Sequence, residues 1–323
     1  MNRTKWAIGV DLGGTKIEVA LIDVNGKIHD RLRIPTDSSL GYKIILEHLT
    51  RAINTIYNKN KIDNYIVGIG VAGQIKKETG IIKYSPNLGW HNVRLQSDLA
   101  KKIRHPVSIC NDVRAATLGE WLYGAGKGYN DFICVFIGTG IGGGIVSNGQ
   151  LLEGYNNTAG EIGHITVDIN GPKCHCGNKG CFEALSGGWA IERDAQIAVR
   201  KNKTAGKLLL DIADGKINSI TAKTLYKGIR QKDKLSEKLF DNVTKALIAG
   251  GVSIVNSFGP QRLILGGGII KGFPKLLPAI EKGIKKNALK AATSSLTIVS
   301  AKLQDDSGVI GAAAFALSKL KKI

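Results

Sequence analysis

The sequence predicts a two-lobed α/β protein with a cleft between its lobes. Three observations support this class: a strand, glycine turn and strand occur twice, helical and strand patterns alternate around both copies, and 323 residues suit two domains of ordinary size. Hydrophobic residues make up 43% of the chain, as in globular proteins.

The first glycine turn lies near the N-terminus. Residues 6–10 are apolar, the motif Asp11-Leu12-Gly13-Gly14-Thr15-Lys16 follows, and residues 17–21 alternate between large apolar and other residues. Alternation with a period of two is typical of a strand, so the pattern predicts a β-hairpin.

The second glycine turn repeats this arrangement. Residues 131–137 form an apolar strand, and the motif Gly138-Thr139-Gly140-Ile141-Gly142-Gly143-Gly144 is interpreted as the turn. Residues 145–149 continue as a strand. Two hairpins with Gly and Thr at their tips indicate a duplicated α/β unit.

The remaining patterns complete the two lobes. We expect strands at 66–71, 107–110 and 262–265, and helices near 42–57, 115–122, 207–239, 246–258, 274–286 and 308–321. The smaller N-terminal lobe is predicted at 1–112 plus about 304–323. The larger lobe is predicted at 113–303, and it includes a metal-binding segment at 164–183.

Both glycine turns are candidates for phosphate binding, because glycine exposes backbone N–H groups. Neither fits a P-loop or a dinucleotide-binding motif, since a strand and not a helix follows each turn. Thr15 and Thr139 can donate to phosphate oxygens, Lys16 supplies a cation, and Asp11 can hold Mg²⁺ directly or through water. The alternative is a pair of tight hairpins that use glycine only for positive φ.

Three of the five cysteines lie within eight residues. Cys174, Cys176 and Cys181, with His164, supply the Cys₃His set of tetrahedral zinc, and four protein ligands predict a structural site. His175 is a competing ligand. Redox-active cysteines and chance clustering are the alternatives, although Cys-x-Cys is unfavourable for a disulfide. Cys110 and Cys134 are expected to be strand residues.

The net charge of +19 invites a nucleic-acid interpretation. The excess is spread along the chain, so we expect a solvated lysine-rich surface and no nucleic-acid partner. No apolar run is long enough for a membrane span, and no signal-peptide core precedes Asp11. We therefore expect a cytoplasmic protein without membrane contact.

Four motifs together carry a resemblance to a known family: Asp11-Leu12-Gly13-Gly14-Thr15-Lys16, Ile137-Gly138-Thr139-Gly140-Ile141-Gly142-Gly143-Gly144, Glu161-Ile162-Gly163-His164 and Cys174-His175-Cys176-Gly177-Asn178-Lys179-Gly180-Cys181-Phe182-Glu183. The sequence resembles the ROK family of sugar kinases, and within it the bacterial-type glucokinases. The resemblance covers essentially the whole chain. It implies the actin-like and hexokinase-like ATPase fold, which is built from duplicated ribonuclease H-like domains.

The resemblance also implies roles for particular residues. Asp112 takes the position of the catalytic base. The positions that hold the sugar are matched by Gly73, Asn111, Asp112, Glu161, His164 and Glu183. The positions that bind ATP are matched by Asp11, Gly13, Gly14, Thr15, Lys16, Gly138, Thr139 and Gly140 at the phosphates and by Gly266, Gly267 and Gly268 at the adenosine.

Several of these residues have simpler interpretations. Asp112 could be only the N-cap of the helix expected at 115–122. Glu161 and Glu183 could be surface carboxylates. However, Glu161 lies three residues before His164 and Glu183 two residues after Cys181, so zinc would hold both on one side of the cleft. We therefore expect zinc to shape the sugar site without performing chemistry.

The resemblance implies an ATP- and Mg²⁺-dependent kinase acting on the 6-hydroxyl of glucose, in a protein that forms homodimers. Fructose, mannose, allose, N-acetylglucosamine and N-acetylmannosamine are alternative substrates, and polyphosphate is an alternative donor. Gln74 stands where some N-acetylmannosamine kinases carry Arg, which disfavours that substrate. A sugar-sensing transcriptional regulator is the alternative from another class. Only ten residues precede Asp11, so we expect no winged-helix domain.

Overall fold

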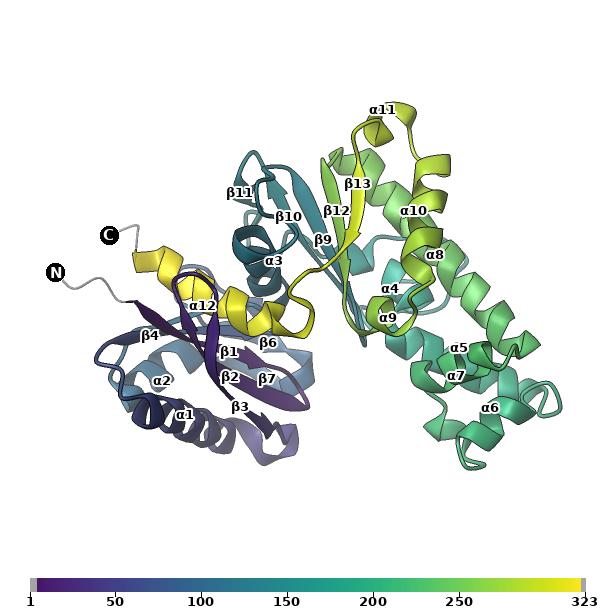
Figure 1. Ribbon diagram of the computed structural model, residues 1–323. Coiled ribbons are helices and arrows are strands. Elements are labelled where there is room, and N and C mark those ends of the chain that lie inside the picture. Colours follow the sequence, from purple (N-terminus) through teal and green to yellow (C-terminus); the bar gives the residue numbers. More distant parts are fainter. Residues whose placement is uncertain (1–4, 321–323) are drawn as a thin grey trace. The chain divides into compact units, whose positions relative to one another are not determined.

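The computed structural model describes residues 5–320 (Figure 1). The chain divides into two compact units. Unit 1 comprises Met1–Asn130, Gly144–Gly160 and Lys302–Ile323, and unit 2 comprises Asp131–Gly143 and Glu161–Ala301. These bounds differ from the predicted lobes at residues 113–130 and 144–160. Helix α3 (Asp112–Tyr123) packs against helix α12 (Ser307–Leu320), and Arg114 of α3 binds Asn157, so both segments belong to unit 1.

Unit 1 is built on a five-stranded sheet with the strand order β3-β2-β1-β4-β8. The strands are β1 (Trp6–Leu12), β2 (Lys16–Asp23), β3 (Ile28–Pro35), β4 (Tyr65–Val71) and β8 (Val107–Asn111). β1, β2 and β3 pair antiparallel, which confirms the first predicted hairpin, whereas β4 and β8 extend the sheet in parallel.

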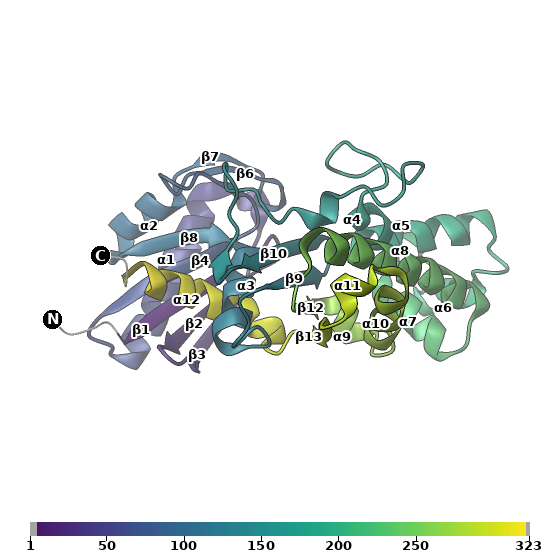
Figure 2. The ribbon, with the colours of Figure 1, turned by 90° about the horizontal axis from the view of Figure 1, so that it is seen from above.

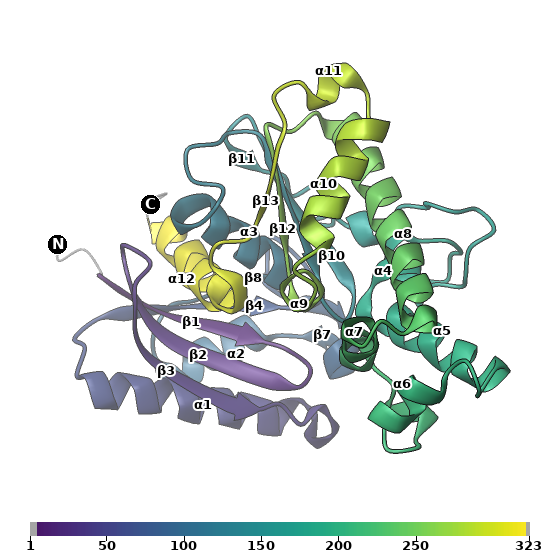
Figure 3. The ribbon, with the colours of Figure 1, turned by 45° about the vertical axis from the view of Figure 1, so that its right-hand side comes forward.

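Helices cover both faces of this sheet, α1 on one and α12 on the other (Figures 1 and 3). Val19 and its neighbours on alternate positions pack toward α1 (Gly41–Asn60) and α2 (Leu95–Ile103), whereas Ala20 and Ile22 pack toward α12. α12 lies very close to the strands, since a Cβ at Gly68 would be 1.8 Å from the carbonyl oxygen of Ala312. A small antiparallel sheet adds β5 (Gln74–Ile75), β6 (Ile82–Ser85) and β7 (Trp90–Val93).

The second sheet has the order β11-β10-β9-β12-β13. Its strands are β9 (Phe132–Ile137), β10 (Ile141–Ser147), β11 (Gln150–Leu151), β12 (Arg262–Gly266) and β13 (Thr297–Ser300). The last two extend β9 in parallel, as β4 and β8 extend β1. The two sheets therefore share one plan, which confirms the duplication.

The prediction for the second glycine turn needs a correction. Strand β10 begins at Ile141, so only residues 138–140 form the turn and Gly142 to Gly144 lie within the strand. Gly144 serves close packing, because a Cβ there would lie 2.0 Å from the hydroxyl of Thr117.

Unit 2 is rich in helices. Its helices are α4 (Phe182–Ser186), α5 (Gly188–Lys201), α6 (Lys207–Ile212), α7 (Ala222–Arg230), α8 (Lys234–Phe258), α9 (Gly268–Gly272), α10 (Leu276–Asn287) and α11 (Lys290–Thr293). The helical pattern expected at 246–258 is the second half of α8, which packs beside α10 (Figure 3). Phe182, Leu247 and Ile284 are among the side chains of this core.

Short 3₁₀ helices complete the chain: Ser38–Leu40, Pro86–Leu88, Ile162–His164, Ile217–Ser219 and Gln304–Asp306. The predicted closing helix is confirmed as α12, although Lys321 lies outside the described residues. Within residues 5–320, no helix combines the length and the apolar character needed to cross a bilayer.

Candidate active site and metal cluster

The predicted catalytic base lies where strand β8 gives way to helix α3. Asn111 is the N-cap of this helix: its side-chain oxygen accepts from the backbone N–H groups of Val113 at 3.0 Å and Arg114 at 3.2 Å. Asp112 is the first residue of the helix. The interpretation of Asp112 as the cap is therefore wrong, because Asn111 already satisfies the exposed N–H groups. The carboxylate lies instead at the positive end of the helix dipole.

Asn111 also connects this helix to Gly73. Its side-chain nitrogen donates to the carbonyl oxygen of Gly73 at 3.5 Å. Gly73 has φ of 153°, and a Cβ there would lie 2.5 Å from the carbonyl oxygen of Tyr84. Only glycine fits this position, so the structure brings Gly73, Asn111 and Asp112 together with a defined backbone.

Asp11, at the end of β1, is a partly buried carboxylate in the same unit. Burial, and then the negative charge of Asp112, raise the pKa of Asp11 to about 6, although Lys16 and Arg33 act in the opposite direction. The backbone at Gly308 closes over this carboxylate, since a Cβ there would lie 2.9 Å from it. Two neighbouring carboxylates at a predicted phosphate loop fit a divalent cation, which would compensate their charge.

We expect Asp11→Asn to stabilise the protein without nucleotide at neutral pH. The folded-state pKa lies above the unfolded value of 3.8, so wild-type stability falls as pH rises from about 4 to about 6 and then levels off. The variant should be more stable by about 3 kcal/mol at pH 7.5 and equal to wild type near pH 4. Urea unfolding at both pH values measures this, and a difference that does not change with pH would refute it.

The turn between β1 and β2 is fixed by backbone contacts. The N–H of Gly13 donates to the carbonyl oxygen of Lys16 at 3.0 Å, and the N–H of Thr36 donates to that of Thr15 at 2.9 Å. Gly14 packs against Asn87, whose carbonyl oxygen would lie 3.0 Å from an added Cβ. None of the glycines at 13, 14, 138 and 140 has positive φ. The alternative of hairpins that need glycine for positive φ is therefore wrong, and close approach explains Gly14.

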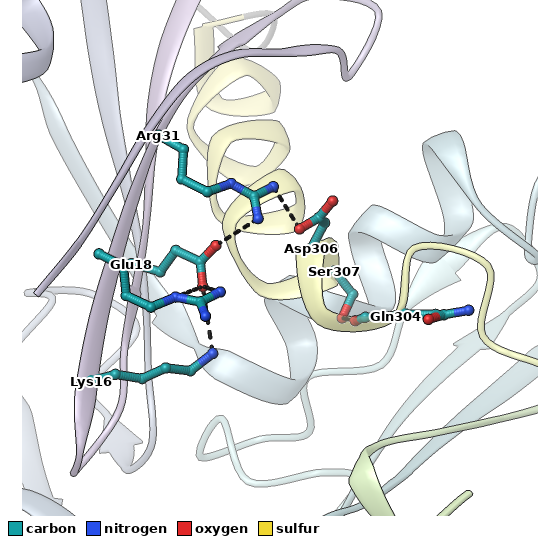
Figure 4. A network of polar contacts seen from close by, with 7 residues as sticks. Lys16, Glu18, Arg31, Gln304, Asp306 and Ser307 are labelled. Atoms are coloured by element: carbon teal, nitrogen blue, oxygen red, sulfur yellow. Dashed lines mark hydrogen bonds and ion pairs between the residues drawn. The ribbon is translucent and has the colours of Figure 1, made fainter. Parts of the chain in front are cut away.

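A buried carboxylate on β2 gathers cations beside this turn. Glu18 is 1% exposed and forms ion pairs with Lys16 at 3.4 Å, Arg31 at 3.2 Å and Arg33 at 2.7 Å. Arg31 also pairs with Asp306 at 2.7 Å, just before α12 (Figure 4). One carboxylate thus holds three cations on one face of the hairpin, which keeps Lys16 beside the glycine turn and makes this face favourable for phosphate.

The second glycine turn, in unit 2, is held by the start of helix α5. The N–H of Gly138 donates to the carbonyl oxygen of Gly140 at 2.9 Å. The N–H groups of Gly188 and Trp189 donate to the carbonyl oxygens of Gly138 at 2.9 Å and Thr139 at 3.0 Å. These contacts fix the backbone of the predicted phosphate loop.

Glu183 lies directly against this turn. Its Oε2 accepts from the backbone N–H of Ile141 at 2.7 Å, and its Oε1 accepts from the indole N–H of Trp189 at 3.1 Å. A Cβ at Gly140 would lie 2.3 Å from Oε2, which explains glycine at that position. Glu183 is therefore no simple surface carboxylate, whereas Glu161 is exposed and precedes the 3₁₀ turn to His164.

The third glycine segment follows β12. Gly267 has φ of 90°, and a Cβ there would lie 2.4 Å from the carbonyl oxygen of Ile137, the residue before Gly138. Helix α9 then begins at Gly268. Gly266 to Gly268 thus lie beside the second glycine turn, as two parts of one nucleotide site would require.

The predicted metal ligands form a cluster. The ligand atoms of His164, Cys174, Cys176 and Cys181 all lie within 4.8 Å of one another, in the segment that leads into α4 (Figure 2). Cys174 Sγ lies 3.7 Å from His164 Nδ1, and Cys176 Sγ lies 3.6 Å from Cys181 Sγ. Tetrahedral zinc places such atoms about 3.5–3.8 Å apart, so these residues fit zinc.

His175, Cys110 and Cys134 do not belong to this cluster. The side chain of His175 stacks on Trp189 with ring centroids 4.0 Å apart, and His175 is absent from the set of described residues that converge on one point. Cys110 and Cys134 are buried in β8 and β9, as predicted. Burial raises the pKa of the Cys110 thiol, which therefore stays protonated and unreactive.

The predicted site residues thus form two groups, one in each unit. Unit 1 brings together Gly73, Asn111, Asp112 and the first glycine turn. Unit 2 brings together Glu161, Glu183, the metal ligands and the other two glycine segments. Glu18, Arg114 and Trp189 support the site but belong to none of the predicted motifs. Arg114 binds residues more than 40 positions later in the chain, whereas Glu18 and Trp189 contact residues on neighbouring elements. A charged residue at a core-facing strand position is the one signal that could have indicated Glu18.

Arg114 organises the segment before Glu161. This buried side chain donates to the side chain of Asn157, to the carbonyl oxygen of Asn157 at 2.7 Å and to that of Ala159 at 3.2 Å. Asn157 in turn donates to the carbonyl oxygen of Ile75 at 2.8 Å. A cavity of about 280 Å³ beside Arg114 and Cys110 includes neither Asn111 nor Asp112 in its lining.

We expect Arg114→Ala to destabilise the protein by about 3 kcal/mol, because it removes the buried donor of the carbonyl oxygens of Asn157 and Ala159. Arg114→Lys should recover only part of this loss, since one ammonium cannot reproduce the fork of the guanidinium. Urea unfolding of both variants measures the effect. Equal stability of the Lys variant and wild type would contradict the role of the fork.

Comparison with known proteins identifies the family of the chain. Residues 7–319 match the ROK family, so the chain belongs to this family. A glucokinase of Halalkalibacterium halodurans is 34% identical over 95% of this chain and 93% of its own length. A solved ROK glucokinase of Streptomyces griseus, in complex with glucose and AMPPNP, has a TM-score of 0.84 and 30% identity, and the match covers 97% and 99% of the two chains. The transcriptional regulator NagC of Escherichia coli is 31% identical over 98% of this chain and 76% of its own length.

Proposed function

We propose that the protein is a sugar kinase that transfers the γ-phosphoryl group of ATP to the 6-hydroxyl of glucose. The observation that carries this proposal is the junction of β8 and α3, where Asp112 lies at a helix N-terminus beside Asp11 and the first glycine turn. Glucokinases that resemble this chain along nearly their whole length support glucose as substrate.

In this mechanism Asp112 accepts the proton of the sugar hydroxyl as the oxygen attacks phosphorus. A hydroxyl is a weak nucleophile until a base takes its proton, and a positioned carboxylate contributes about 10² to 10⁴ in rate. Gly73, Asn111, Glu161, His164 and Glu183 orient the sugar.

The nucleotide is held by the glycine turns. The N–H groups and threonine hydroxyls at 13–15 and 138–140 bind its phosphates, with Lys16 as the cation, and Gly266 to Gly268 lie against the adenosine. Asp11 would hold Mg²⁺, directly or through water, and the ion would supply positive charge to the phosphates. The positive charge of Mg²⁺ would also compensate the negative charges of Asp11 and Asp112.

Zinc in this proposal is structural. His164 Nδ1 faces Cys174, which leaves Nε2 for a sugar hydroxyl, and Cys181 directly precedes the helix that carries Glu183. The zinc segment therefore orients two residues of the sugar site. Cytoplasmic location and a homodimer, carried over from the family, belong to the same proposal.

The specificity constant kcat/KM with ATP, measured for glucose, mannose, fructose, allose and the two N-acetylhexosamines, tests the substrate. We expect glucose to have the highest value. Polyphosphate in place of ATP tests the donor. Absence of sugar-dependent ADP formation with every sugar would refute the kinase, and binding of an operator DNA would then favour the regulator, to which the similarity with NagC points.

A further inference from the structure

Trp189 connects three parts of unit 2 that the proposed function uses separately. Its backbone N–H donates to Thr139 in the second glycine turn at 3.0 Å. Its indole N–H donates to Glu183 Oε1 at 3.1 Å. Its ring stacks on His175, between two predicted zinc ligands, with centroids 4.0 Å apart and planes inclined by 24°.

The bond to Glu183 determines the orientation of that carboxylate. The N–H of Ile141 holds Oε2 from one side, at 2.7 Å. A single contact at Oε2 leaves rotation about the last bond of the side chain, which is broad for glutamate. The indole N–H removes this freedom, because it fixes the second oxygen as well.

The position of Trp189 is itself fixed. It is the second residue of α5, and the two glycines before it pack against the glycine turn: a Cβ at Gly188 would lie 2.7 Å from the carbonyl oxygen of Gly138. The ring is also contacted by Arg193, whose guanidinium carbon lies 5.0 Å from the ring centroid. The indole therefore reaches Glu183 with little loss of freedom on binding.

We infer that Trp189 is a positioning residue for sugar binding, which holds Glu183 in its binding orientation and connects it to the zinc segment through His175. This inference rests on the proposed function for the role of Glu183. It assigns to Trp189 no contact with the reacting atoms. It predicts that loss of the indole N–H lowers the affinity for the sugar and leaves the affinity for the nucleotide unchanged. The reason is that Trp189 contacts Thr139 in the glycine turn through its backbone N–H and not through its indole.

Trp189→Phe is the decisive variant, since it keeps a ring on His175 and removes the N–H. We expect the KM for the hexose, and its Kd in calorimetry, to rise about tenfold, as for loss of a hydrogen bond to a charged group. The KM for ATP, kcat and the zinc content should stay within about twofold of wild type. Trp6→Phe is the matched control, because Trp6 also contacts a histidine ring, that of His29 at 4.8 Å, and lies in unit 1. Trp6→Phe should change neither the KM nor the Kd for the hexose.

Two further measurements separate positioning from a merely structural role. In the Glu183→Gln background, Trp189→Phe should add little, because the two residues act as one unit. Release of zinc to a chelator, which needs no sugar, should be accelerated by Trp189→Ala and not by Trp189→Phe. Unchanged hexose affinity in Trp189→Phe, additive effects of the two substitutions, or wild-type zinc release in Trp189→Ala would each overturn the inference. A wild-type protein that phosphorylates no hexose refutes the proposed function instead, and the zinc measurement still tests Trp189.

Discussion

Asp112→Asn is expected to lower kcat for the hexose by about 10² to 10⁴, because the amide cannot accept the proton of the sugar hydroxyl. The KM for the sugar should change little, since Asn has nearly the same size and can still form hydrogen bonds. A coupled assay of ADP formation measures both constants.

Asp112→Asn is expected to fold like the wild type, because of the position of Asp112 in helix α3. Asn111 caps helix α3 through its own side chain, so the helix keeps its N-cap when Asp112 changes. Loss of one negative charge near a helix N-terminus costs about 0.3–1 kcal/mol, which urea unfolding can verify. Asp211→Asn, at an exposed position in α6, is the matched control and should retain full turnover. Full turnover in Asp112→Asn would refute the assignment of the base.

The parts of the fold that were predicted correctly have local signals. The hairpin of β1 and β2 joins neighbouring segments, and alternation along residues 17–21 is sufficient to find it. The predicted zinc ligands also have a local signal, because three of the four lie within eight residues of one another. The duplication is confirmed because both sheets repeat the same order of strands around a glycine turn.

The features that the sequence did not indicate depend on tertiary contacts. The start of β10 was predicted too late, because three glycines suggest a turn unless one knows that Thr117 packs against Gly144. The predicted lobe boundary at residue 112 differs from the division into compact units for a similar reason: α3 packs on α12, almost 200 residues later. No local pattern carries such information.

The sequence indicated the motif residues of the candidate site but not the residues that support them. Motifs located Asp112, the glycine turns and the cysteines, but the residues that hold them came only from the structure. Glu18 gathers cations from β2 and β3, Arg114 binds a segment about 40 residues later, and Trp189 contacts Glu183 through its side chain. Residues that bind substrates tend to lie in recognisable motifs, whereas their supporting residues are defined by proximity in space.

Cys181→Ser is expected to have the second large effect, through zinc. Cys181 is fully buried and is the N-cap residue of α4, two positions before Glu183. Loss of this ligand should reduce bound zinc from about one per chain to a small fraction, and it should lower kcat/KM for the hexose by about 10- to 100-fold, because Glu183 and His164 lose their support. Metal analysis and the coupled assay measure the two effects.

The zinc assignment has a matched control inside the same segment. His175 lies between two of the cysteines, yet its ring stacks on Trp189 and it is no member of the cluster. His175→Ala should therefore keep the full zinc content, whereas His164→Ala should lose it. If His175→Ala loses zinc and His164→Ala keeps it, the ligand set is wrong. If Cys181→Ser loses zinc but keeps full kcat/KM, Glu183 keeps its orientation without zinc. Zinc would then support only the fold of its own segment.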